Sequence, residues 1–174
     1  LIFTPTAVST VTINGNLDNS GIINYTPSSS GNSFYLGSSS SNSLSNDGKI
    51  IYNQADTTSG PTISFLYGNI INGTNGTIDV TSAGGGTVTA SNVSSMTNLG
   101  TIKIVETSGS GMTSVWGNGS SSTLNNSGTF TIDNSGASSG STINFNFGGG
   151  VTNSGALSLS YPAGSTSIWS LGTG

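Results

Sequence analysis

A nine-residue pattern that recurs about every 27 residues constrains the fold more than any other feature of this chain. It reads apolar, x, Asn, x, Gly, x, apolar, x, apolar. The five complete copies are Leu17–Tyr25, Leu44–Tyr52, Met96–Ile104, Leu124–Ile132 and Val151–Leu159. A sixth, degenerate copy ends in Gly76–Val80 and has Thr74 where the others have asparagine. A period of this length is typical of proteins that stack one structural unit per repeat.

A second, looser motif lies between these copies and consists of alternating apolar residues that usually end at a glycine. Examples are Phe34–Gly37, Ile63–Gly68, Ser114–Gly117, Phe145–Gly148 and Trp169–Gly172. Alternation with a period of two indicates strands, and no helical periodicity persists anywhere in the chain. We therefore predict an all-β fold, a single parallel β-solenoid of about six coils with about 27 residues in each.

We expect residues 1–174 to form one domain and to be a piece of a longer protein. The repeat copies lie near 11–37, 44–68, 71–90, 96–117, 124–148 and 151–172.

Stacking these copies predicts three rows of inward side chains, one residue from each coil. The first row is Leu17, Leu44, Met96, Leu124 and Val151; the second is Ile23, Ile50, Ile78, Ile102, Phe130 and Leu157; the third is Tyr25, Tyr52, Val80, Ile104, Ile132 and Leu159. A fully buried side chain of this size contributes about 1.5–3 kcal/mol, so these rows are the main stabilising contribution.

The asparagines and glycines of the pattern are predicted to build the corners of the coils. Stacked asparagines form an amide ladder, in which each side chain bonds its equivalent one coil away. The predicted ladder residues are Asn19, Asn46, Asn98, Asn126 and Asn153. The glycines are expected to supply a positive φ at the corner. They are Gly21, Gly48, Gly76, Gly100, Gly128 and Gly155.

The amino-acid composition excludes most kinds of catalytic and metal-binding site. The chain has 174 residues, of which Ser, Thr, Gly and Asn supply 106, and it contains no His, Cys or Arg. It therefore lacks an imidazole base, a thiolate nucleophile and the usual zinc ligands, and we predict no enzyme activity, metal or cofactor. The chain has only two lysines and a net charge of −4, which argues against nucleic acid and anionic membranes as partners.

Two other functions receive weak support from the sequence. Asp18 and Asp47 are the only candidate carboxylate pair for glycoside cleavage, at near-equivalent corners without an evident cleft. Thr77, Thr101 and Thr129 should stack on one outward position, and threonine rows on flat solenoids can bind ice. Their partner column is mixed and includes Asp79 and Lys103, predicted to be neighbours in an exposed ion pair.

The stretches Leu44–Tyr52 and Leu124–Ile132 resemble coils of bacterial filamentous haemagglutinins and autotransporter passengers. They are also similar to the N-terminal adhesin domain of hyphally regulated cell-wall proteins of yeasts. The likeness covers residues 11–159 as a pattern. It implies a secreted, right-handed β-helix that acts as a stalk or adhesive surface outside the cell, and it supplies no catalytic residues.

The sequence thus predicts an extracellular structural or adhesive solenoid whose Ser/Thr/Asn-rich surface contacts glycans or cell surfaces. Exposed aromatic side chains are common platforms for carbohydrate, and the candidates are Tyr35, Tyr161 and Trp116. The alternative prediction is a subunit that assembles with copies of itself into an extracellular filament, stacked through open solenoid ends.

Overall fold

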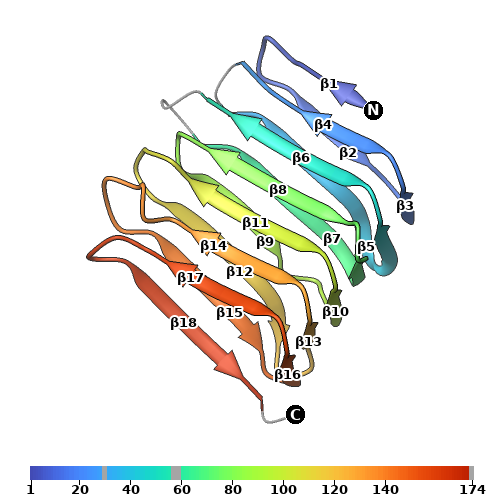
Figure 1. Cartoon of the computed structure of the whole chain (residues 1–174). Coiled ribbons are helices and arrows are strands. Elements are labelled where there is room, and N and C mark those ends of the chain that lie inside the picture. Colours follow the sequence, from blue (N-terminus) through green and yellow to red (C-terminus); the bar gives the residue numbers. More distant parts are fainter. Residues whose placement is uncertain (29–30, 56–59, 173–174) are drawn as a thin grey trace.

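A computed structural model describes residues 1–28, 31–55 and 60–172, which form a stack of parallel β-coils (Figure 1). Every strand pairing is parallel and joins a strand to its equivalent in the next coil, about 4.8 Å away. The prediction of an all-β solenoid of about six coils is confirmed.

The strands make three faces, which we call the front, back and short faces. The front face is a seven-stranded sheet. It contains β1 (Ile2–Phe3), β4 (Ile22–Tyr25), β6 (Lys49–Gln54), β8 (Thr77–Ser82), β11 (Thr101–Glu106), β14 (Thr129–Asp133) and β17 (Ala156–Ser160).

The back and short faces belong to one eleven-stranded sheet, because two long strands, β5 (Ser33–Asn46) and β7 (Thr62–Asn72), continue around the corner between them. The back face holds their first halves with β2 (Thr10–Ile13), β9 (Gly86–Ala90), β12 (Met112–Gly119), β15 (Thr142–Phe147) and β18 (Thr166–Leu171). The short face holds their second halves with β3 (Leu17–Asn19), β10 (Ser95–Asn98), β13 (Thr123–Asn126) and β16 (Gly150–Asn153).

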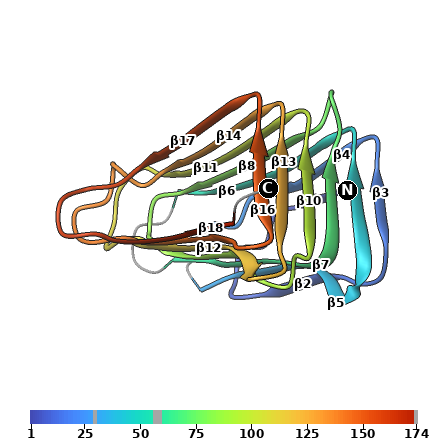
Figure 2. The same ribbon diagram turned by 90° about the horizontal axis from the view of Figure 1, so that it is seen from below.

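Each coil runs along the back face, turns onto the short face and returns along the front face. Figure 2 shows the wedge-shaped cross-section this produces, with the short face at its broad end. In Figures 1 and 2 the coils wind in the right-handed sense as the chain advances from the N- to the C-terminus.

The three predicted inward rows are confirmed by the strand register. Ile50 pairs with Ile78 and Tyr52 with Val80 on the front face, and Met96 pairs with Leu124 on the short face. The first row also contains a residue that the sequence pattern missed, because Ile70 pairs with both Leu44 and Met96. In the central coils these side chains are almost completely buried.

The predicted asparagine ladder is present and runs through the corner between the short and front faces. From Asn19 to Asn126, each Nδ2 donates to the Oδ1 of the asparagine in the next coil, over 2.6–2.8 Å. Each Nδ2 also donates to a backbone carbonyl, such as Thr129 O from Asn98 at 3.0 Å. Both amide hydrogens are therefore used in the buried middle of the ladder.

The third coil contributes Asn72 to this ladder, which corrects the prediction that Thr74 replaces the asparagine there. Asn72 accepts from Asn46 and donates to Asn98, each over 2.8 Å. The corner between Asn72 and Gly76 is two residues longer than in the other copies, and a Gly76 N to Gly73 O bond closes it. The chain preserves the ladder and loops the extra residues outward.

The glycines of the pattern do not adopt a positive φ, and this part of the prediction is wrong. Gly48, Gly100 and Gly128 instead lie against the backbone of the preceding coil. A Cβ on any of them would be 2.1–2.2 Å from a glycine carbonyl oxygen. Positive φ occurs at the other motif, where Gly37 (φ 83°) and Gly117 (φ 89°) turn the chain from the back face toward the short face.

We predict that Gly128→Ala lowers the free energy of unfolding by roughly 1–3 kcal/mol, because the added methyl collides with Gly100 O. Gly21 occupies the same motif position in the first full coil, and a Cβ added there would have no other atom within 4 Å. Gly21→Ala should therefore change stability by less than about 0.5 kcal/mol. Urea denaturation measures both, and equal losses would contradict the close-approach explanation.

Candidate functional site

The three aromatic residues predicted to contact glycans lie in three different environments. Trp116 is a core residue with 1% of its surface exposed, so its proposed role as a surface contact is wrong. It points inward because it pairs with Ala90, whose small side chain leaves room for the indole between Phe65 and Phe130.

Tyr35 and Tyr161 reach the surface but do not form a common platform. Tyr35 is half-buried on the back face, between Thr12 and Ser64. Tyr161 is 43% exposed and follows β17, at the opposite end of the stack. A sugar ring that stacks on one of them cannot reach the other, so no paired aromatic platform forms from these residues.

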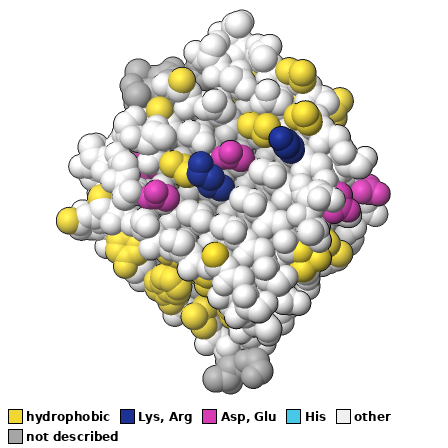
Figure 3. All heavy atoms as spheres, in the orientation of Figure 1, with side chains coloured by type: hydrophobic (Ala, Val, Ile, Leu, Met, Phe, Trp, Pro, Cys, Tyr) yellow, Lys and Arg dark blue, Asp and Glu magenta, His cyan; other side chains and the backbone are white. Residues whose placement is uncertain are grey.

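Charged side chains are visible on the front face (Figure 3), whose strands carry Lys49, Asp79, Lys103 and Asp133. Asp79 and Lys103 are direct cross-strand neighbours there, as predicted. Asp18 pairs with Ser45 rather than with Asp47, so the two carboxylates do not occupy equivalent positions. The described residues contain no cluster of three or more acidic, His or Cys side chains that would hold a metal ion.

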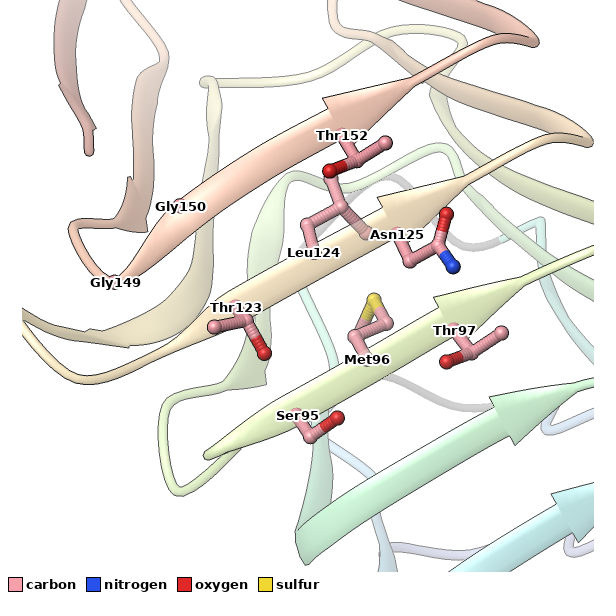
Figure 4. A pocket seen from close by; sticks show the side chains of 9 residues that line it. All are labelled: Ser95, Met96, Thr97, Thr123, Leu124, Asn125, Gly149, Gly150 and Thr152. Atoms are coloured by element: carbon pink, nitrogen blue, oxygen red, sulfur yellow. The ribbon is translucent and has the colours of Figure 1, made fainter. Parts of the chain in front are cut away.

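A shallow hollow of ≈ 200 Å³ on the short face is the best candidate for a binding site (Figure 4). It forms in the outward column Ser95, Thr123, Gly150, because the glycine has no side chain to fill the space beside the serine and threonine. Thr97, Asn125 and Thr152 border it from three successive strands.

The polar groups around this hollow are available to a ligand. Within the described part of the chain, the side chains of Thr97, Asn125 and Thr152 make no hydrogen bond. Thr123 Oγ1 makes one long bond, to Ser94 O at 3.5 Å. The hollow therefore offers uncharged donors and acceptors, and none of its nine lining residues carries a carboxylate, amine, imidazole or thiol group. Sequence reasoning missed it because only the register reveals which hydroxyl groups stand beside Gly150.

A second feature missed by the sequence is a buried carboxyl group at the narrow edge of the wedge. Glu106 is 1% exposed, and it accepts from Gly111 N at 3.1 Å and bonds Ser141 Oγ at 3.3 Å. Burial raises the pKa of this carboxyl above its ordinary value of 4.5, although the hydrogen bonds from Met112, Gly111 and Ser141 oppose the shift.

Comparisons with family models, with curated proteins and with solved structures find no match to this chain. Among the residues that the structure describes, no helix is long and apolar enough to cross a membrane. The fold and the surface chemistry are therefore the grounds on which a function can be argued.

We predict that Glu106 makes the protein less stable as pH rises. Between pH 4.5 and the raised pKa, the unfolded chain loses this proton while the folded chain keeps it. The free energy of unfolding therefore falls across that window and then levels off. Glu106→Gln has nearly the same shape and cannot ionise, so it should remove this fall. Thermal unfolding from pH 3 to pH 8 tests it, and identical profiles for the two proteins would contradict it.

Proposed function

We propose that this chain is an extracellular, non-catalytic β-solenoid that serves as a structural and adhesive segment and contacts glycans through its polar surface. The observation that carries the proposal is the hollow on the short face, bordered by Thr97, Asn125 and Thr152 with unused hydrogen-bonding groups. Neutral hydroxyl and amide groups suit sugar hydroxyls, which both donate and accept.

The stiffness of the stack supports an adhesive role. The strands that carry the hollow are fixed by the buried Met96 and Leu124 and by the ladder residues Asn98 and Asn126, so the outward groups are held in place. A preorganised site loses less entropy on binding than a flexible loop does. A single small hollow still gives weak affinity, and repeated display on a surface would strengthen attachment.

A glycan array with the purified protein, followed by calorimetry on the best ligand, tests this function. Asn125→Trp should fill the hollow and weaken binding by about tenfold or more, equivalent to about 1.4 kcal/mol. Ser45→Trp is the matched control, because Ser45 occupies the same outward column three coils earlier. We expect the control to bind as the native chain does.

Two results would contradict the proposal. One is the absence of binding to any glycan by folded protein displayed at high density. The other is glycan binding that both tryptophan variants weaken equally, which would place the contact away from the hollow.

Assembly of copies into a filament is the second candidate function, and the last described coil offers a surface on which another coil can stack. Trp169 and Leu171 pair with the buried residues Phe145 and Phe147, yet they are 43% and 49% exposed. The ladder also has a direction. Within the described residues, Asn19 Oδ1 at one end accepts no bond from another asparagine, and Asn153 Nδ2 at the other end donates to none. A further coil, whether of the same chain or of a second copy stacked end to end, would cover these apolar residues and extend the ladder.

Negative-stain electron microscopy at several protein concentrations tests this assembly. Long uniform fibres that lengthen with concentration are expected, and Leu171→Asp should shorten them because it places a charge in the stacking surface. Ile71→Asp is the control, since Ile71 is 40% exposed on the side of the rod. Isolated short rods at every concentration would exclude self-assembly.

A further inference from the structure

The back face carries a column of hydroxyl groups that extends over its seven successive strands. The register places one residue of each coil in it, and six of the seven are threonine. The column is Thr10, Ser33, Thr62, Thr87, Thr113, Thr142 and Thr166. The coils impose a repeat of about 4.8 Å along it.

These hydroxyl groups are not used by the protein itself. Within the described residues, none of the seven side chains makes a hydrogen bond, and all seven are exposed or half-buried. Each of these residues is followed along its strand by an inward residue. Ile63 and Val88 are examples; both are completely buried and hold the strands in place. The column is therefore a rigid series of hydroxyl and methyl groups that faces solvent.

The neighbouring outward column continues this chemistry with less regularity. It consists of Thr12, Tyr35, Ser64, Thr89, Val115, Asn144 and Ile168. Thr89 Oγ1 donates to Ser64 Oγ at 3.2 Å, so hydroxyl groups of adjacent coils lie at hydrogen-bonding distance in this column. Small hydroxyl and β-branched side chains predominate across the face.

Charge is absent from the described strands of the back face. The described charged side chains lie on the front face (Lys49, Asp79, Lys103, Asp133), on the short face (Asp18), at a corner (Asp47) or in the interior (Glu106). A charged group holds its own hydration shell tightly and opposes contact with a neutral partner. The back face is therefore suited to a neutral, periodic partner.

We propose that the back face binds ice. Ice is an uncharged lattice of water whose oxygen atoms repeat at a spacing close to that between adjacent coils. A rigid column of hydroxyl and methyl groups can order water at this spacing and join the lattice without displacing a charged group's hydration. A crystalline polysaccharide fits the face less well, because sugar rings stack on aromatic side chains and Tyr35 is the only aromatic residue in these two columns.

The shorter threonine column on the front face does not have these properties. Thr77, Thr101 and Thr129 stack as predicted, but Lys49 precedes them in the column and Asp79 and Lys103 occupy the next one. This difference supplies a matched control. Thr87 is the central member of the back column and Thr101 the central threonine of the front one, and both are half-buried on parallel strands.

The experiment measures thermal hysteresis, ice recrystallisation inhibition and retention of fluorescently labelled protein in a growing ice hemisphere. The native protein should be active in all three. Thr87→Lys should raise the concentration needed for recrystallisation inhibition by about tenfold, or about 1.4 kcal/mol. Thr101→Lys should leave it unchanged. Thr113→Lys repeats the test at a second back-face position, and circular dichroism establishes that each variant is folded.

Three outcomes would overturn the inference. The first is a folded native protein that is inactive in all three assays, and the second is an equal loss of recrystallisation inhibition in Thr87→Lys and Thr101→Lys. The third is a native protein that does not bind ice but is retained on crystalline cellulose or chitin, with Thr87→Lys abolishing that retention. The inference does not depend on the hollow of the short face. Asn125→Trp should leave ice activity intact, so the two proposals fail separately.

Discussion

The close approach of adjacent coils at the corner between the short and front faces is the constraint on which the remaining structure depends. There, the carbonyl oxygen of one glycine occupies the space that a Cβ of the next would need, as with Gly100 O and Gly128. The asparagine ladder lies beside this contact and joins the same coils through side-chain bonds of 2.6–2.8 Å. Together these two contacts fix how each coil is positioned on the one before it, and this positioning sets the register between paired strands.

A fixed register makes the core a set of columns, and each column has to fill a space of limited width. Like side chains therefore recur in the front-face rows, while the back face balances large against small, as where Ala90 accommodates Trp116. The third coil shows which requirement dominates. Its corner is two residues longer, yet Asn72 and Ile70 keep their places, because losing a ladder member would leave buried amide groups unpaired.

The sequence predicted the parts of the structure that repeat with the strong motif. The front-face rows and the ladder follow from counting residues from each glycine. Asn72 was missed because the count began at Gly76, and the interpretation of these glycines was wrong because a sequence does not distinguish a positive φ from close packing. The back-face column was missed because it belongs to the looser motif, whose offset changes with loop length and with irregularities such as the one after Gly37. The hollow exists because Gly150 has no side chain, and the sequence motifs do not show that this glycine lies beside Thr123.

The differences among the three faces are informative because outward residues contribute little to the stability of a solenoid. The core rows and the ladder fix the fold, so an outward position tolerates most polar side chains. Without a selective contact, charges and hydroxyl groups would be distributed similarly over all faces. Instead, the front face carries both lysines, while the back face is uncharged over its described strands and aligns seven unused hydroxyl groups. From this segregation we infer that the faces meet different partners, and that variants on one face should leave the binding of another unchanged.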